Sequence, residues 1–244
     1  MGKHGKYWSL VGAFSLLAMS WASAAISECR QALSIGLDIS GSVDTKEYRL
    51  QMDGLAGALL QRDVMNAFLA IPSAPVRLHI YEWSGVNTQR VVVDWADIET
   101  AQDLQQIAGV LRQTERGPRE IETAIGNSMI YGINALSQQN GCWRRTLDLS
   151  GDGESNKGPR PRKIARSMAG QTTINGIVIG QTASPRGNSA LAKLKVYFQS
   201  EVIRGPDAFV ETARGFADFE DAMARKLLKE LQTPAVGQLE QRNQ

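Results

Sequence analysis

The chain has 244 residues, with 27 lysines and arginines against 25 aspartates and glutamates, and 43% of its residues are hydrophobic. This length is enough for one substantial domain with its own core. Removal of residues 1–24, which contain two lysines and no acidic residue, would leave 25 cationic and 25 acidic side chains. A general polyanion-binding protein normally has a basic excess, so this balance argues against that class.

The N-terminal residues follow the pattern of a secretory signal peptide. A basic start precedes a mostly apolar run over residues 7–18, and Ala-Ser-Ala at residues 22–24 is a small-residue cleavage signature. The alternative is a membrane anchor, but the run is short and interrupted for a bilayer span. We therefore expect cleavage after about Ala24 and a secreted, most simply periplasmic, protein with no transmembrane segment. Residues 25–232 would form one domain, and residues 233–244 a disordered tail.

The first half of this domain begins with a buried strand over residues 31–38. Asp44 and Glu47 have the spacing of a capping box, which predicts the start of a helix. Residues 76–83 and 89–95 predict two strands joined by a short loop, hence a hairpin in a mixed sheet.

Helices and strands continue to alternate in the second half. Asp97 is expected to cap the next helix, and a later apolar stripe from Ile121 to Leu136 predicts a helix with Thr123 in its first turn. The remaining expected elements are a strand at 144–151, a short helix from the prolines at 159 and 161 to Met168, strands at 172–180 and 207–213, and a final helix at 216–231. This alternation predicts a three-layer α/β sandwich around a mostly parallel sheet.

Two cysteines follow the signal sequence, Cys29 and Cys142. Each lies just before a predicted strand, nine residues before Asp38 and ten before Asp152 respectively. If these strands are parallel neighbours, both thiols lie at one edge of the sheet, opposite the two aspartates. In an oxidising compartment this arrangement predicts a disulfide, and two free buried thiols are the alternative.

Oxygen-bearing side chains gather where the predicted strands end. Asp38, Ser40 and Ser42 stand on a tight turn after the first strand, Thr123 near the start of a helix, and Asp152 in a glycine-rich turn after a later strand. In open α/β sheets this edge is where ligands bind. Hard divalent cations prefer oxygen ligands of these kinds. The alternative is that the aspartates only cap helices or accept hydrogen bonds from turn amides.

In this order, the sequences DISGS, TAIG around Thr123 and DGESN resemble the metal-ion-dependent adhesion site of von Willebrand factor type A domains. The resemblance covers residues 31–231 and points to an uncharacterised secreted bacterial branch of that family. It implies a six-stranded, Rossmann-like sheet with strand order 3-2-1-4-5-6. It also implies that Ser40, Ser42 and Thr123 ligate the ion directly or through water, with Asp38 and Asp152 contacting it or holding its waters.

The chain departs from the family pattern at two positions beside the motif. Glu122 stands where glycine is frequent, and Gly151 stands where threonine is commoner. Both bear on the affinity for the ion and on the choice of ion more than on the fold.

Several other charged and aromatic residues have more than one interpretation. Three residues are candidates for a rim around the ligand: Arg119, Glu122 and Lys157. The cations near this edge have two interpretations, either solvated loop charge or a positive rim that steers an acidic partner. These cations are Arg116, Arg119, Lys157, Arg160 and Arg162. His79, the one histidine that would remain after cleavage, lies within a strand and is expected to be structural, which argues against a serine–histidine–aspartate hydrolase.

The leading hypothesis is a secreted adhesion-type module, not an enzyme, that recognises an exposed carboxylate on a protein or envelope ligand through a divalent cation. Mg²⁺ is the first candidate for the cation, with Mn²⁺ or Ca²⁺ as alternatives. One alternative function is a metal-dependent phosphohydrolase with Asp38 as nucleophile, although Ser40 replaces the second aspartate of the common pattern. Another is a structural envelope protein with a vestigial site. Nothing in the sequence predicts nucleic-acid binding.

Overall fold

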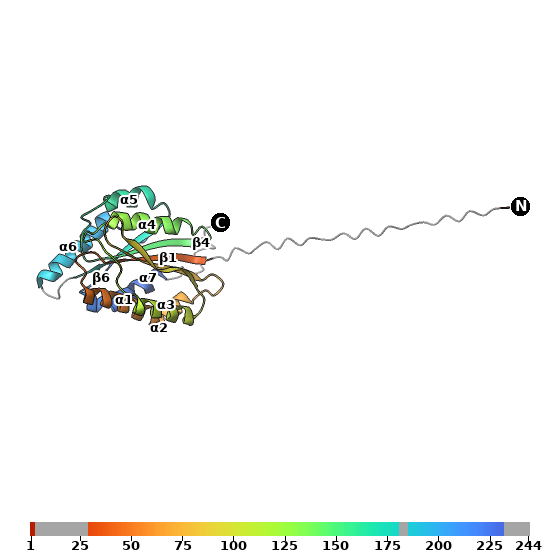
Figure 1. Ribbon diagram of the computed structural model, residues 1–244, viewed down its shortest axis with the longest axis horizontal. Helices are drawn as coiled ribbons and strands as arrows, with labels where there is room; N and C mark the ends of the chain where they lie inside the picture. The colour runs from red at the N-terminus through yellow and green to blue at the C-terminus, as the bar shows by residue number, and fades with distance from the viewer. Residues whose placement is uncertain (3–28, 181–184, 232–244) are drawn as a thin grey trace, which may run out of the picture.

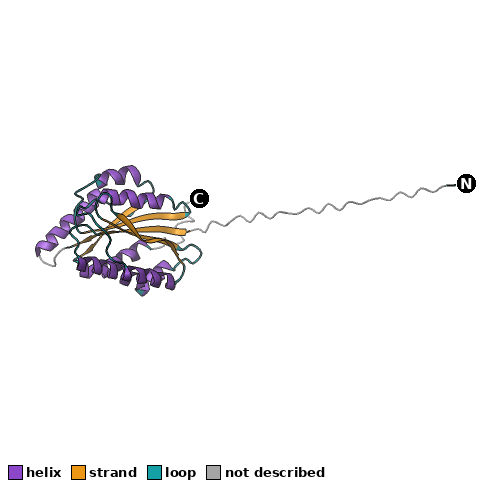
Figure 2. Cartoon of the chain, viewed as in Figure 1, coloured by secondary structure: helices purple, strands orange, loops and turns teal. Residues whose placement is uncertain are grey.

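The computed structural model describes residues 1–2, 29–180 and 185–231. Over these residues the chain forms one six-stranded sheet between two layers of helices (Figure 1, Figure 2). The predicted cleavage region and the predicted C-terminal tail lie outside the described residues, so both remain predictions.

The sheet has the predicted strand order, β3-β2-β1-β4-β5-β6. Every neighbouring pair is parallel except the hairpin of β2 and β3, which confirms the mostly parallel, mixed sheet. The loop between β2 and β3 is too short for a crossover, so this pair must be antiparallel. The strands are β1 (Cys29–Asp38), β2 (Val76–Trp83), β3 (Gln89–Ile98), β4 (Cys142–Gly151), β5 (Thr173–Ile179) and β6 (Val210–Ala213).

Helices cover both faces of the sheet (Figure 1). One layer contains α1 (Thr45–Leu60), α2 (Arg62–Phe68), α3 (Ala101–Gln113) and α7 (Phe219–Glu230), which follows a short 3₁₀ turn, η1 (Phe216–Asp218). The other layer contains α4 (Ile125–Ser137), α5 (Pro161–Met168) and α6 (Pro185–Glu201). Among the described helices, none has the length and apolar character needed to cross a bilayer.

The central strand β1 is buried along its whole length because both of its faces are covered. Leu33, Ile35 and Leu37 pack into the core on the α1 and α7 side, whereas Ala32 packs into the core beneath α4 and α6. Burial on both faces explains why the strand reads as a continuous buried run rather than a polar–apolar alternation.

The predicted capping box at Asp44 and Glu47 is present at the start of α1, but the cap predicted at Asp97 is wrong. Asp97 lies in β3, where its carboxylate forms a two-point ion pair with Arg77. Pairing with β2 extends the strand to Ile98, so the helix starts later, and Thr100 caps α3.

The structure also moves the start of α4. This helix begins at Ile125, after an Ala124 cap, so Thr123 lies in the preceding loop rather than in the first helical turn. Ile121, expected on the buried stripe, is 82% exposed in that loop. The loop is held by bonds to distant segments, described below, which a helical pattern in the sequence does not reveal.

Two helices were not predicted, and one strand is shorter than expected. Helix α2 was not separated from α1, and α6 was missed although Leu194 and Phe198 bury one face of it at helical spacing. Strand β6 spans Val210–Ala213 instead of 207–213.

The predicted disulfide is present between Cys29 and Cys142. The two residues are paired in register at the beginnings of β1 and β4, with Cα atoms 4.4 Å apart. Because these strands are parallel, their other ends also meet. The disulfide therefore closes the edge of the sheet opposite Asp38 and Asp152.

Candidate metal-binding site

The five predicted donors converge at the carboxyl edge of the sheet. Asp38 ends β1, Ser40 and Ser42 follow it in the turn before α1, Thr123 immediately precedes the Ala124 cap of α4, and Asp152 follows β4. The adjacency of β1 and β4 brings the two aspartates together, as parallel strand ends require.

A chain of hydrogen bonds links these side chains. Thr123 Oγ1 donates to Ser40 Oγ at 3.1 Å, and Ser40 Oγ lies 3.3 Å from Ser42 Oγ. Ser42 Oγ donates to Asp152 Oδ1 at 2.6 Å. Asp38 Oδ1 accepts from the Ser40 amide at 2.8 Å. Three hydroxyls and two carboxylates from three segments of the chain therefore form one contiguous cluster.

Burial makes this cluster electrostatically unfavourable without a cation. Asp38 is fully buried, and burial raises the pKa of its carboxyl to about 7, with a further contribution from the nearby charge of Asp152. Hydrogen bonds from Ser40 and the charge of Arg116 partly oppose this increase. Within the described residues, Asp38 Oδ2 is buried and accepts no hydrogen bond. A bound cation would stabilise such an oxygen.

The donors are of a particular chemical kind. Among the described residues, no group of three or more histidine, cysteine, aspartate or glutamate side chains is arranged to hold a metal. The cluster instead combines two carboxylates with three neutral hydroxyls, all hard oxygen donors. These donors suit an oxygen-coordinated divalent cation rather than a soft-metal site of cysteines.

Two arginines hold the turn that carries Ser40 and Ser42. Arg116 Nη2 donates to the carbonyl oxygens of Ile39 at 3.0 Å and of Ser40 at 3.3 Å, and also to that of Val43. Arg119 Nη1 donates to the carbonyls of Ser40 at 3.0 Å and Val43 at 3.1 Å. The sequence suggested solvated or steering charge for both. In the structure they position the backbone of the turn, and Arg119 is also exposed.

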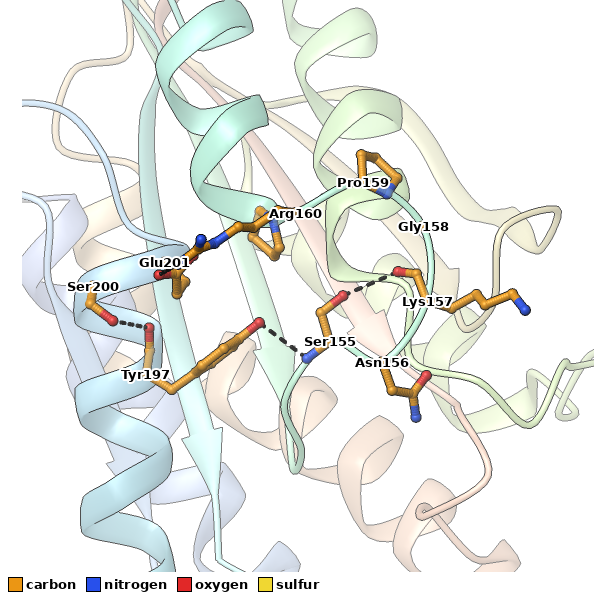
Figure 3. A pocket seen from close by; sticks show the side chains of 10 residues that line it. Ser155, Asn156, Lys157, Gly158, Pro159, Arg160, Tyr197, Ser200 and Glu201 are labelled. Carbon is orange, nitrogen blue, oxygen red and sulfur yellow. Dashed lines mark hydrogen bonds and ion pairs between the residues drawn. The ribbon is translucent and has the colours of Figure 1, made fainter.

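The loop after β4 fixes Thr123. The Thr123 amide donates to Asn156 Oδ1 at 2.9 Å, and its carbonyl accepts from the Asn156 amide at 2.9 Å and from Ser155 Oγ at 3.2 Å. The Ser155 amide in turn donates to the hydroxyl of Tyr197 on α6 at 3.2 Å (Figure 3). Asn156 was quoted in the sequence motif but not assigned a role. This positioning role became visible only when the two loops were placed together.

A second set of polar groups forms hydrogen bonds with the backbone of Asp38. Gln51 Nε2 donates to the Asp38 carbonyl at 3.0 Å, and Ser150 Oγ, 2.8 Å from Gln51 Oε1, lies 3.1 Å from the Asp38 amide. Gln51 is fully buried on α1. The signal of this role in the sequence is a polar residue on the apolar stripe of that helix.

Gly151, one of the two departures from the family pattern, has a structural reason. A Cβ at this position would lie 3.0 Å from Phe198 Cζ and 3.7 Å from Asp38 Oδ2. The contact with Phe198 would be tight, so a side chain at this position requires Phe198 to shift, whereas the contact with the carboxylate would be ordinary. Glu122, the other departure, is half-buried and takes no part in the hydrogen bonds that link the five donors.

Lys157 and His79 lie away from the cluster. Lys157 is exposed in the loop after β4 and lines a neighbouring cavity (Figure 3). His79 is buried in β2, where its Nδ1 lies 2.9 Å from Ser34 Oγ and its ring stacks on Trp95. Burial lowers the pKa of His79 to about 4. A substrate cannot reach a serine–histidine pair that is buried inside the sheet. This agrees with the prediction that His79 has a structural role.

A model described as "Protein of unknown function (DUF1194)" matches residues 28–235. The chain belongs to this family. No curated protein matches the sequence.

Solved structures with a similar fold include three informative proteins. Proximal thread matrix protein 1 from the mussel byssus, in a structure with a zinc-occupied MIDAS motif, has 17% identity and a TM-score of 0.55, with 82% of this chain and 48% of that one covered. The pilus adhesin SpaC from Lactobacillus rhamnosus GG has 15% identity and a TM-score of 0.57, with 83% and 31% covered. A von Willebrand factor type A protein from Catenulispora acidiphila has 16% identity and a TM-score of 0.52, with 83% and 43% covered.

These similarities establish the fold. The six-stranded sheet with its seven helices is the α/β, Rossmann-like fold of von Willebrand factor type A domains, as the sequence resemblance implied. This DUF1194 chain spans less than half of the length of each of the three proteins.

Proposed function

We propose that this protein is a secreted adhesion-type binding module that recognises an acidic group on a protein or envelope ligand through a divalent cation. The cation would be held by Asp38, Ser40, Ser42, Thr123 and Asp152, with Mg²⁺ as the first candidate and Mn²⁺, Ca²⁺ or Zn²⁺ as alternatives. One observation carries the proposal: three hydroxyls adjoin two carboxylates, one of which has a buried oxygen that accepts no hydrogen bond from the described residues.

The charge of the donor set supports recognition of an acid. Three of the five donors are neutral hydroxyls, so the protein supplies few negative charges to a divalent cation. Mg²⁺ favours six oxygen ligands and commonly keeps several waters. An external carboxylate that replaces a water adds the missing negative charge, so an acidic group on a partner is the natural ligand.

The arrangement gives less support to a hydrolase. Asp38, the candidate nucleophile, is fully buried, and a nucleophile has to reach its substrate. No covalent chemistry is needed for the proposed role. Two of the structurally similar proteins, by their names a pilus adhesin and a thread matrix protein, are in keeping with a binding role.

Export is part of the proposal. The disulfide between Cys29 and Cys142 fits an oxidising compartment, and the N-terminal pattern fits a cleaved signal peptide. We place the mature protein outside the cytoplasm, most simply in a bacterial periplasm.

The first experiment is titration calorimetry of the purified protein with MgCl₂, MnCl₂, CaCl₂ and ZnCl₂ after treatment with EDTA. Ser42→Ala removes an exposed hydroxyl that contacts Asp152, and we expect a loss of cation affinity of about tenfold or more. Ser137→Ala is the control, because among the described residues this exposed serine bonds to its own helix alone, at the Asn134 carbonyl. Absence of cation uptake by folded wild-type protein would refute the proposal.

The ligand can be tested next. Crosslinking pull-downs from periplasm with and without EDTA should give partners that are lost on chelation and lost in Ser42→Ala. If no captured partner is lost on chelation or in Ser42→Ala, the vestigial-site alternative is favoured.

A further inference from the structure

Positive charge is concentrated in one short segment next to the candidate site. Residues 157–166 contain five lysines and arginines and no acidic residue, in a chain whose charges otherwise nearly balance. Helix α5 in this segment buries Pro161, Ile164 and Ala165 against the fold and leaves its cations exposed. Every charged side chain on the exposed side of the helix is therefore a cation.

Two cavities adjoin α5, and Glu201 at the end of α6 lines both of them. The larger, of about 620 Å³, is lined by Lys157, Arg160 and Tyr197 among others. In Figure 3 Arg160 points toward Glu201, whereas the side chain of Lys157 points away from Tyr197. The smaller, of about 180 Å³, is lined by Arg162, Arg166 and Arg204. We call the exposed area formed by Lys157, Arg160, Arg162, Arg166 and Arg204 the α5 basic surface.

Glu201 compensates only part of this charge. Among the described residues, it is the one acidic side chain that lines either cavity. Arg160 forms a two-point ion pair with it, with Nη2 2.6 Å from Oε1 and Nε 2.7 Å from Oε2, and Arg162 lies 4.0 Å away. The α5 basic surface therefore has five cations against one carboxylate, which Arg160 already neutralises.

We propose that the α5 basic surface is a docking surface for an acidic segment of a protein partner, and that this docking needs no divalent cation. Guanidinium groups bind carboxylates through paired hydrogen bonds, and cavities beside them can receive discrete side chains. A lipid bilayer fits less well. The apolar residues of α5 are buried, so the helix has no apolar face to insert.

The position of the surface joins it to the candidate metal site. Ser155 and Asn156 line the larger cavity, and both bond to Thr123. An acidic segment that occupies this cavity would therefore lie beside the five-donor cluster. One partner can then contact both surfaces, with the α5 basic surface providing attraction that is independent of the cation.

The test is fluorescence anisotropy of a dye-labelled decaglutamate peptide with the full-length protein in EDTA, which removes any contribution of the metal site. We expect binding that weakens strongly between about 50 mM and about 500 mM NaCl. Arg162→Glu combined with Arg166→Glu should weaken it about tenfold or more. Lys46→Glu combined with Arg112→Glu makes the same change in net charge on exposed residues of the opposite helix layer and should leave it within about twofold.

Each outcome is decisive. No binding of the peptide at low salt, or equal loss in both double variants, would overturn the proposal. A third result would also overturn it: the protein binds phosphatidylglycerol vesicles but not the peptide, and Arg162→Glu/Arg166→Glu weakens the vesicle binding. A membrane would then be the partner. If thermal melting shows that this double variant is unfolded, Arg166→Glu combined with Arg204→Glu serves in its place. Because EDTA is present throughout, failure here leaves the metal-dependent proposal untouched, and the reverse also holds.

Discussion

Replacement of Asp38 by asparagine should stabilise the metal-free protein at neutral and higher pH. The carboxyl is fully buried, one of its oxygens accepts no hydrogen bond from the described residues, and Asp152 is nearby. These conditions disfavour the charged form. Asparagine removes the charge and can keep the bond from the Ser40 amide to Oδ1, which measures 2.8 Å in the wild type.

The size of the effect follows from the pKa. Folding raises the pKa of Asp38 from 3.8 to about 7, which corresponds to about 4 kcal/mol of folding free energy. The folded value lies above the unfolded one. The carboxyl therefore contributes its full stability below pH of about 4, and this contribution is lost as the pH rises through about 7. At pH 8 in EDTA, Asp38→Asn should have a free energy of unfolding up to about 4 kcal/mol above that of the wild type, and the difference should vanish near pH 4.

Urea unfolding in EDTA across this pH range measures the difference, with Asp221→Asn, an exposed residue in the first turn of α7, as the control. Addition of MgCl₂ should then raise the melting temperature of the wild type but not that of Asp38→Asn. An asparagine variant that is less stable than the wild type at pH 8 in EDTA would refute the reasoning about the buried charge.

Three further predictions concern the scaffold. Because burial lowers the pKa of His79 from 6.5 to about 4, the wild type should lose about 3 kcal/mol relative to His79→Gln as the pH falls from about 6.5 to 4; parallel urea curves would contradict this. Loss of the disulfide in Cys29→Ser/Cys142→Ser should cost about 2–5 kcal/mol because it closes a long loop, and an unchanged melting temperature would show otherwise. Gly126→Ala, whose Cβ would collide with a backbone carbonyl of the loop before α5, should cost about 2 kcal/mol, whereas Gly109→Ala, with open space in α3, should gain about 0.5–1 kcal/mol; equal effects would disprove the packing argument.

The donor residues of the candidate site could be predicted from the sequence, but the residues that hold those donors in place could not. Asp38 and Asp152 follow apolar strands, and their positions at the strand ends are local features of the sequence. The bonds of Arg116 to the turn after β1, and those of Asn156 to Thr123, join segments far apart in the chain. No periodicity within one segment carries information about such bonds, so these residues were interpreted as loop charge or left without a role.

The errors in the fold have the same origin. Asp97 has the form of a helix cap, yet pairing with β2 keeps it in β3. Thr123 has the spacing of a first helical turn, yet its backbone is bonded to Asn156 in the loop after β4. In both places a contact with another segment outweighed the local preference.

The sequence by itself determined the alternation of strands and helices and the placement of Asp38 and Asp152 after strands, because hydrophobic periodicity is a property of short segments. It predicted the pairing of Cys29 with Cys142 on the condition that their strands are parallel neighbours, which the structure supplies. The tertiary structure decided how the donors touch, that Asp38 is fully buried, and that the cations around α5 gather on one surface. Burial and charge density depend on which segments meet in space, and that is settled only when the two helix layers close over the sheet.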